Sequence, residues 1–273
     1  MTTLAGKTLF ITGSTRGIGR EIALRAARDG ARVVITGKTS EPHAKLAGTI
    51  HTVADEVRAA GGQALAIQLD VRDDAAVAAA VAQAAQAFGG IDILVNNASA
   101  ISLTPTEATP AKRFDLMMSV NVRATFLCSQ ACLPWLKRAP NPHILTLSPP
   151  LSMDAKWFKG HVAYTISKYG MSMCTLGMAQ ELRPAGIAVN SLWPRTTIAT
   201  AAVEVHFPAA ILKASRHAAI MADAAHAILT SDAKTHTGNF YIDEDVLRRG
   251  GEKDFERYAV SPGTPLFADL FVD

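Results

Sequence analysis

The sequence of 273 residues has little net charge and no long apolar run, and each shortage excludes a class of protein. The net charge is +3 and the lysines and arginines are scattered, so we expect no nucleic-acid partner. No apolar run approaches the ~20 residues of a membrane-spanning helix, so we expect no membrane span. Because the segment from Met1 to Phe10 lacks a charged start followed by a long apolar stretch, no secretion signal is predicted.

Cysteine is also scarce, with only Cys128, Cys132 and Cys174 in the chain. An odd count without a secretion signal favours reduced thiols and a cytoplasmic location. Cys128 and Cys132 are spaced to share one face of a helix, but the sequence places no further metal ligands near them. We therefore predict that they pack in the core and that the chain has no metal site.

The sequence does contain a regular alternation of short β-rich runs and longer helical runs. With 49% hydrophobic residues, the chain can fill the core of one large domain. The alternation predicts an α/β fold in which helices cover both faces of a parallel sheet of about seven strands. The expected strands are Lys7–Thr12, Arg32–Thr36, Ala64–Leu69, Ile91–Asn96, His143–Ser148, Ile187–Leu192 and Gly238–Ile242.

The expected helices include two long ones, Pro110–Lys137 and His161–Arg183. Pro134 is expected to kink or end the first of them. Residues 1–245 carry the alternating pattern and are predicted to form the single domain. Residues 246–273 do not continue it, so we expect a C-terminal extension that packs on the domain or on a partner subunit.

Three glycines, Gly13, Gly17 and Gly19, stand between the first strand and the first helix. Glycine there lets the backbone approach a pyrophosphate closely, and the helix N-terminus offers free N–H groups to the anion. A tight turn without a ligand is the simpler alternative. It is weakened because this turn follows the first strand of a βαβ pattern.

A second motif is the pair Tyr164 and Lys168, which are spaced to share one face of a helix. A free tyrosine has a pKa near ~10 and is a poor acid or base at neutral pH. An ammonium group beside it lowers that pKa, and such a tyrosine can exchange a proton with an alcohol or carbonyl oxygen. The spacing alone occurs by chance on many helices, so its meaning depends on the rest of the chain.

Taken together and in order, these motifs resemble the short-chain dehydrogenase/reductase family over about residues 5–245. The glycine spacing Gly-x-x-x-Gly-x-Gly, the run Asn96-Asn97-Ala98-Ser99, Asn121 in Ser-Val-Asn-Val and Tyr-x-x-x-Lys carry the resemblance. It implies a Rossmann-type doubly wound sheet and an oxidoreductase that uses a nicotinamide dinucleotide. It also implies cofactor contacts from Gly13, Ser14, Thr15, Arg16, Gly17, Ile18, Gly19, Lys38, Asp70, Val71, Asn97, Ala98, Ser99, Tyr164, Lys168, Pro194 and Thr197.

The resemblance also implies catalytic roles. Tyr164 would pass a proton to the carbonyl oxygen, Lys168 would lower the pKa of Tyr164 and hold the nicotinamide ribose, and Asn121 would order a water. The family's serine lies thirteen positions before the tyrosine, where this chain has Leu151. Ser148 is the favoured replacement because it ends the fifth strand before two prolines. Ser152 is the alternative, and either residue could be an ordinary turn serine.

The cofactor is predicted to be NADP in preference to NAD. After the second strand the chain reads Gly37-Lys38, and no Asp or Glu follows until Glu41. An acidic residue there would bind the ribose 2′-hydroxyl of NAD. Arg16 and Lys38 would instead attract a 2′-phosphate, although Lys38 could be a solvated surface lysine.

A narrower resemblance, to the hydroxysteroid dehydrogenase-like subgroup, rests on the segments 143–151, 157–159, 163–173 and 238–244. Mammalian members carry a further lipid-carrier domain, which we do not expect here. Arg195 replaces the family's usual glycine, either as a cation that faces the cofactor phosphates or an anionic substrate, or as a surface arginine. Trp157, Phe158 and Trp193 are predicted to line an apolar substrate pocket, although aromatic residues are more often core.

The leading hypothesis is therefore an NADP-dependent oxidoreductase that acts on a small apolar carbonyl compound or alcohol. The resemblance further implies a homodimer or homotetramer, assembled through the helix that carries Tyr164. Two alternatives stay open. One is a non-catalytic NADP-binding sensor or assembly protein on the same fold, and the other is a 3-oxoacyl thioester reductase.

Overall fold

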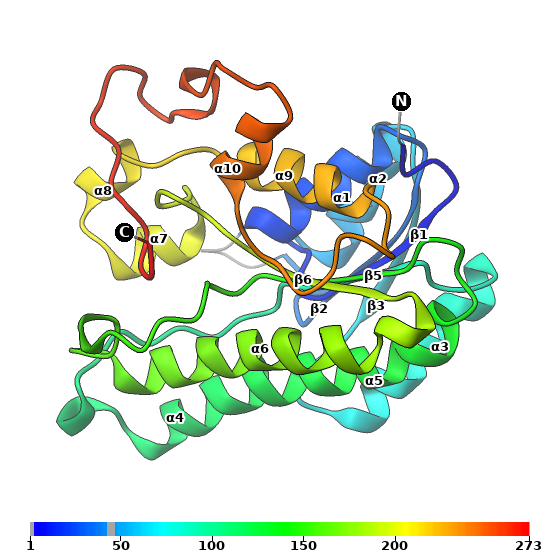
Figure 1. Ribbon diagram of the computed structural model, residues 1–273, viewed down its shortest axis with the longest axis horizontal. Helices are drawn as coiled ribbons and strands as arrows, with labels where there is room; N and C mark the ends of the chain where they lie inside the picture. The colour runs from blue at the N-terminus through cyan, green and yellow to red at the C-terminus, as the bar shows by residue number, and fades with distance from the viewer. Residues whose placement is uncertain (1–2, 43–46, 273) are drawn as a thin grey trace.

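Seven parallel strands form one sheet with helices on both faces (Figure 1), as the sequence predicts. The computed structural model describes residues 3–42 and 47–272. The strand order is β3-β2-β1-β4-β5-β6-β7. The strands are β1 (Thr8–Ile11), β2 (Arg32–Gly37), β3 (Gln63–Gln68), β4 (Ile93–Asn96), β5 (His143–Thr146), β6 (Ala188–Trp193) and β7 (Phe240–Ile242).

Two layers of helices enclose the sheet (Figure 1). On one face lie α1 (Gly17–Ala27), α2 (Ile50–Ala59), α9 (Ala219–Leu229) and α10 (Asp243–Arg249). On the other lie α3 (Asp74–Phe88), α4 (Ala111–Met117), α5 (Ala124–Leu136) and α6 (Val162–Glu181). Two short helices, α7 (Ala201–His206) and α8 (Ala209–Lys213), follow β6.

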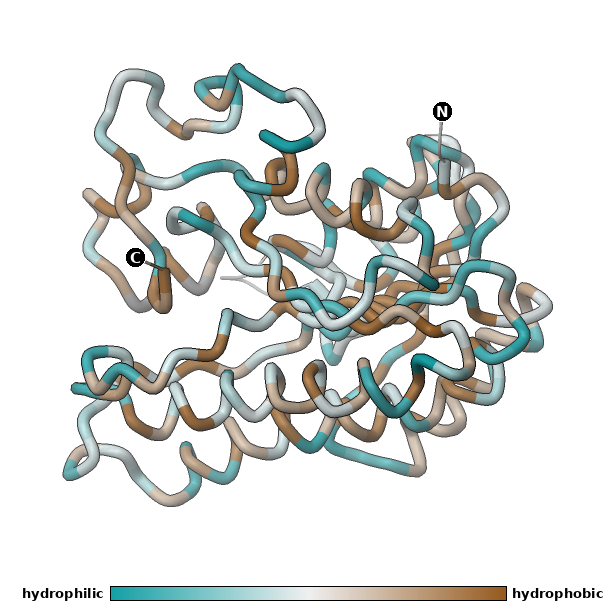
Figure 2. The backbone as a smooth tube through the Cα atoms, viewed as in Figure 1, coloured by the Kyte–Doolittle hydropathy of each residue, from teal (hydrophilic) through white to brown (hydrophobic). Residues whose placement is uncertain are grey.

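The pleat of the strands builds one hydrophobic core under each helical layer. In β1, Leu9 and Ile11 belong to the core beneath α1 and α9, whereas Phe10 belongs to the core beneath α3 and α5. Successive side chains of a strand point to opposite faces, so a strand buried on both faces must be apolar throughout. Figure 2 accordingly shows the central strands as the most hydrophobic part of the tube.

Local signals set the ends of the alanine-rich helix α3. The Asp73 carboxylate accepts a hydrogen bond from the Ala76 amide at 3.0 Å and so caps the first turn. Gly89 ends the helix with φ +80°, a left-handed conformation that glycine adopts without strain.

The direction of winding reverses between β1 and β4, which are neighbours in the sheet. From β1 the chain adds β2 and β3 on one side, then returns to place β4 and the later strands on the other. The connections on either side diverge at such a point, which leaves a crevice at the carboxyl ends of the strands where ligands bind.

The structure differs from the sequence expectation within the long helix predicted at Pro110–Lys137. It comprises α4, a π-helical segment at Met118–Arg123 and α5. Pro134 lies inside α5, which ends two residues later at Leu136. The residues after β6 form α7 and α8, which were not predicted because they are too short to display a clear helical period. Among the described residues, no helix has both the length and the apolar character needed to cross a bilayer.

The C-terminal tail contacts its own domain. The predicted boundary at residue 245 falls inside α10, so the extension begins with helix rather than with a linker. The tail then runs to α8 and the loop after β6 (Figure 1). The Phe267 amide donates to the Ala214 carbonyl at 2.9 Å, and the Thr197 amide donates to the Phe267 carbonyl at 3.0 Å.

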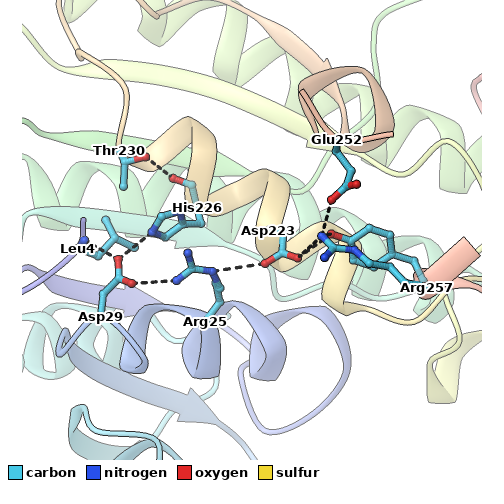
Figure 3. Close-up of polar contacts among 9 residues, drawn as sticks. Leu4, Arg25, Asp29, Asp223, His226, Thr230, Glu252 and Arg257 are labelled. Atoms are coloured by element: carbon cyan, nitrogen blue, oxygen red, sulfur yellow. Dashed lines mark hydrogen bonds and ion pairs between the residues drawn. The ribbon is translucent and has the colours of Figure 1, made fainter. Parts of the chain in front are cut away.

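A partly buried carboxylate fastens the N-terminal segment and α1 to α9 (Figure 3). Asp29 accepts hydrogen bonds from the Leu4 amide at 2.8 Å, from Arg25 at 2.9 Å and from His226 at 2.7 Å. Burial alone would raise the pKa of Asp29, but these three donors together hold the pKa well below its ordinary value. Arg25 also pairs with Asp223 of α9 at 3.3 Å, which continues the network toward the tail.

We expect Asp29→Asn to lower the free energy of unfolding at pH 7 by about 1–3 kcal/mol, because charge-assisted hydrogen bonds are lost. A depressed carboxyl pKa stabilises the fold above the unfolded value near ~3.9 and loses that contribution as pH falls through the folded pKa. The deficit of the variant should therefore shrink below about pH 4. Urea unfolding across pH measures this deficit.

Asp55→Asn is the matched control. Asp55 pairs with Arg58 at 2.7 Å, but its side chain is 76% exposed. Such a surface pair contributes about 0–1 kcal/mol. Equal losses in the two variants would contradict the role given to Asp29.

Candidate active site

Close backbone packing at the carboxyl ends of β1 and β4 forms the glycine-rich turn. Gly13 has φ +65°, and a Cβ atom there would lie 2.9 Å from the Ala98 Cα. A Cβ atom on Gly19 would lie 2.5 Å from the Asn97 Nδ2. The Asn97 amide group donates to the carbonyls of Thr12 and Gly13, both at 2.9 Å. Gly13 and Gly19 are therefore required by packing between the two strand ends.

An open cleft of about 630 Å³ begins at this turn and runs toward β2 and β3. Its walls include most of the residues that the sequence assigned to the cofactor: Gly13, Thr15, Arg16, Gly17, Ile18, Lys38, Asp70, Val71, Asn97, Ala98 and Ser99. Ser14 is an exception, because it is fully buried and its hydroxyl group bonds to the backbone of Ile11 and Thr36. Gly19 contributes to packing, as described above. The cleft therefore has the shape and backbone approach that a dinucleotide requires.

Three cations and one carboxylate surround the far end of the cleft. Lys38 lies 3.5 Å from Asp70, so the structure places a carboxylate beside the lysine where the sequence around residue 38 showed none. Arg72 also pairs with Asp70, and this hydrogen bond is the main reason that the pKa of Asp70 is lowered. Arg16 donates to Thr39 and to the carbonyls of Ala47 and Gly48. The balance of formal charge remains positive because Arg72, which the sequence analysis missed, adds a third cation.

A smaller cavity of about 190 Å³ adjoins the cleft and holds the predicted catalytic pair. Both spaces are lined by Asn97 and Ser99, so they lie next to each other. The cavity wall includes Tyr164 and Lys168, together with the predicted residues Trp193, Pro194 and Thr197. The structure therefore brings together side chains from α6 and from the ends of β4 and β6.

Lys168 is buried and tightly held. Its Nζ donates to the Leu147 carbonyl at 2.7 Å and lies 4.9 Å from the centre of the Trp193 ring. Burial lowers the pKa of Lys168 to about 7, against the opposing charge of Asp269.

The Tyr164 phenol is buried in the same wall of the cavity. Burial, and secondarily the charge of Asp269, raises the pKa of Tyr164 above its ordinary value. Within residues 3–42 and 47–272, no hydrogen bond joins Tyr164 to Lys168. The sequence-based expectation that Lys168 lowers the pKa of Tyr164 is therefore not met in this conformation, since burial dominates.

Asn121 acts as a brace in the described structure. It is fully buried in the π-helical segment, and its amide group bonds to the Ala100 backbone N–H at 2.7 Å and carbonyl at 2.9 Å. It also donates to the Ser167 hydroxyl at 2.9 Å. These bonds tie the loop after β4 to α6, next to Tyr164. The predicted water-ordering role of Asn121 stays a prediction.

The structure does not support Ser148 as the catalytic serine. Its hydroxyl group lies 2.9 Å from the Ser191 hydroxyl, which donates to Thr175 at 2.8 Å, and all three side chains are fully buried. β5 ends at Thr146, and the Ser148 amide turns back to donate to the Thr146 carbonyl at 3.0 Å. This turn directs the Ser148 hydroxyl toward Ser191 and leaves Leu147 on the cavity wall. The alternative, Ser152, accepts a hydrogen bond from the Asp154 amide at 3.3 Å. Neither serine is among the residues that line the described cavity.

Arg195 is paired with α10 rather than with the cleft. Its guanidinium group bonds to both carboxylate oxygens of Asp245 at 2.8 Å. Its amide donates to Asp243 at 2.9 Å. The structure therefore favours the interpretation of Arg195 as a surface arginine over that of a cation facing the cofactor phosphates or an anionic substrate.

The tail supplies side chains at this site that the sequence analysis missed. Asp269 and Leu270 line the cavity with Tyr164, and the Trp193 indole donates to the Leu270 carbonyl at 2.7 Å. Phe271 packs on Trp157 and Trp193, two of the residues predicted to bind substrate. The third, Phe158, packs edge-on against Tyr169. No sequence signal marks these tail residues, because the segment lacks a regular hydrophobic period.

Comparison with known proteins finds close relatives. The family model for short chain dehydrogenase matches residues 7–208. The chain is 58% identical over 270 residues to hydroxysteroid dehydrogenase-like protein 2 of Rattus norvegicus and 59% identical over 270 residues to that of Xenopus tropicalis. Each match covers 99% of this chain, but only 51% and 64% of those proteins. The chain thus spans about half to two thirds of their length.

Solved structures agree with this result. A short chain dehydrogenase from Mycobacterium thermoresistibile is 52% identical with a TM-score of 0.94, covering 99% of this chain and 96% of that one. A metagenomic short-chain oxidoreductase solved in complex with NADP is 26% identical with a TM-score of 0.73, covering 88% of this chain and 97% of that one.

The site analysis yields a prediction for Asp269. Burial raises the pKa of this carboxyl to about 7. A carboxyl with a raised folded pKa contributes its full stability below the unfolded value near ~3.9 and loses it as pH rises toward the folded pKa. The unfolding free energy of the wild type should therefore fall relative to Asp269→Asn between about pH 4 and pH 7, by at most about 4 kcal/mol. Urea unfolding of both proteins measures the difference, and a difference independent of pH would contradict the burial of this carboxyl.

Proposed function

The chain belongs to the short-chain dehydrogenase family, and from that premise we propose that it is an NADP-dependent oxidoreductase of apolar carbonyl compounds and alcohols. The observation that carries the proposal is the position of Tyr164 and Lys168 in one cavity that adjoins the dinucleotide-sized cleft. When bound, the nicotinamide supplies or accepts the hydride. The protein's own part is to hold the cofactor, to orient the substrate and to move one proton.

The residues of the cleft fit the proposed cofactor. The glycine turn and the start of α1 would hold the pyrophosphate, since backbone amides there have no helical partner. Pro194 and Thr197 lie at the cavity, where the nicotinamide end would reach. The excess of Arg16, Lys38 and Arg72 over Asp70 favours a ligand with a 2′-phosphate.

Tyr164 is the proposed proton carrier. In reduction its hydroxyl group gives its proton to the substrate oxygen, and in oxidation the phenolate takes the proton from the alcohol. Lys168 stands close enough to act on the same cavity, and its hydrogen bond to Leu147 fixes the direction of its side chain. Asn121 keeps α6 and the loop after β4 in register, which makes it a positioning residue.

The lining of the cavity supports an apolar substrate. Besides the polar groups of the catalytic pair and Asp269, the wall is built mainly from Ile101, Leu147, Trp193, Val203, Phe207 and Met221. Such a mixture of an apolar wall and a few convergent polar groups is typical of sites for small organic molecules.

Assembly into a homodimer or homotetramer and a cytoplasmic location belong to the same proposal. Large apolar side chains on the outer faces of α5 and α6 support self-association: Phe126, Ile166, Met173 and Leu176 are all exposed. The three cysteines are free thiols, which is compatible with a reducing compartment.

The decisive experiment follows NADPH consumption with a panel of apolar aldehydes, apolar ketones and 3-oxoacyl thioesters. Tyr164→Phe should lower kcat by roughly 10²–10⁴-fold, because proton transfer is lost, while the Kd for NADPH stays within a few-fold of the wild type. If the wild type binds NADPH tightly but consumes it with none of the panel, the proposal is wrong and a sensor is favoured. Consumption confined to 3-oxoacyl thioesters would instead assign a thioester reductase.

The cofactor preference is tested separately by Lys38→Asp. We expect the affinity for NADPH to fall by about 10–100-fold and NADH to become the preferred ligand, because a cation that faces the 2′-phosphate becomes an anion. Fluorescence titration gives both dissociation constants. Lys234→Asp is the matched control, since it makes the same change of charge at an exposed turn before β7. Equal affinity of the wild type for NADPH and NADH would refute the preference.

A further inference from the structure

The ring of Phe271 lies inside the aromatic cluster that surrounds the catalytic tyrosine. Its centre is 6.2 Å from the ring centre of Tyr164 and 5.9 Å from that of Trp193. It is 5.8 Å from Trp157 and 5.4 Å from Tyr169. With 4% of its surface exposed, this tail residue is as buried as an internal core residue.

Two hydrogen bonds hold the tail at the end of β6, beside the catalytic cavity. The Asp269 amide donates to the Arg195 carbonyl at 3.1 Å, directly after β6. The Leu270 carbonyl accepts from the Trp193 indole at 2.7 Å. Trp193 is the last residue of β6 and Arg195 follows two residues later, so the tail is held against the same strand end that forms the cavity wall.

The backbone at Phe271 is strained. Its φ is +70°, and among the described residues it is the only residue other than glycine with a positive φ. A bulky side chain adopts this left-handed conformation only where its surroundings compensate for the strain. Here the compensation is the insertion of the ring among Tyr164, Tyr169 and Trp193.

Phe271 lies directly behind the wall of the cavity, against Tyr164 and Trp193, and is not itself among the residues that line it. Trp157, which the sequence analysis assigned to the substrate pocket, touches the Phe271 ring and is not among the residues that line the cavity. The space between Trp157 and Tyr164 is therefore filled by the protein's own tail. The cavity stops at Tyr164, Trp193 and Leu270, all of which contact or neighbour Phe271.

From this arrangement we propose that Phe271 is a specificity-determining residue, which limits the bulk of the substrate accepted at Tyr164. The inference rests on the proposed oxidoreductase function. A substrate whose oxygen reaches the Tyr164 hydroxyl lies in the cavity of about 190 Å³, and the Phe271 ring fills the space behind the wall residues Tyr164 and Trp193, between them and Trp157. Removal of the ring leaves space into which this wall can give way to a bulkier substrate.

The test compares kcat/KM for a series of ketones of increasing bulk, from a short linear ketone to a fused-ring ketone, at saturating NADPH. Phe271→Ala should raise the ratio of bulky to small substrate by about tenfold or more, since pocket size discriminates on this scale. Phe267→Ala is the matched control: it makes the same substitution in the same tail, at a ring that is 46% exposed, and should leave the ratio unchanged.

Two outcomes would overturn the inference. A uniform rise of kcat/KM over all substrates would mean that Phe271 is a plug that inhibits every substrate alike. An unchanged ratio of bulky to small substrate in a folded variant, with kcat/KM either unaltered or lowered equally for all substrates, would mean that the ring only supports Tyr164. Either result is distinguishable from failure of the proposed function, in which the wild type itself would bind NADPH and reduce no ketone.

If Phe271→Ala does not fold, Phe271→Leu keeps an apolar side chain of smaller reach in the cluster. Circular dichroism and the Kd for NADPH show whether either variant retains the native site. The leucine variant should shift the ratio in the same direction as the alanine variant, by about threefold or more. No shift in folded Phe271→Leu contradicts the inference.

Discussion

The site depends on the close contact between the ends of β1 and β4. At this point the winding of the sheet reverses, so the loops on either side diverge. The Asn97 side chain donates to the carbonyls of Thr12 and Gly13, and the Thr12 hydroxyl group accepts from the amides of Asn97 and Ala98. These bonds hold the two strand ends together. Glycine is the residue type that fits at positions 13 and 19, because a Cβ atom would collide with Ala98 at the first position and with Asn97 at the second. The cleft for a dinucleotide therefore follows from the topology together with these contacts.

Burial is the second constraint, and it shifts the pKa values of the ionisable side chains in the cavity that holds Tyr164 and Lys168. It lowers the pKa of Lys168 and raises the pKa values of Tyr164 and Asp269. All three shifts disfavour the charged form, as expected where a low-polarity wall replaces water. The surroundings therefore disfavour a charged Lys168 ammonium group and a charged Tyr164 phenolate. The neutral forms of these side chains are favoured. A tyrosine in these surroundings keeps its proton and is a weaker acid than a free tyrosine.

Features with a regular period or fixed spacing could be predicted from the sequence. The seven strands, the glycine turn and the pairing of Tyr164 with Lys168 on α6 belong to this group. The orientation of Ser148 could not be predicted, because the strand ends at Thr146 and the turn that follows is fixed by contacts with Ser191 and Thr175 across the core. Arg72 stands only two residues after Asp70, but the sequence does not show that its side chain turns back to that carboxylate at the cleft.

The tail was the least predictable part, for a physical reason that also bears on its role. Its conformation is fixed by tertiary contacts of Phe271 and by hydrogen bonds to the end of β6, not by helix or strand periodicity. Asp269 and Phe271 are separated by one residue, so one short segment supplies both the carboxyl that lines the cavity and the ring that packs on Tyr164. The polarity of the cavity and the packing of its wall therefore depend on the same contacts with the end of β6.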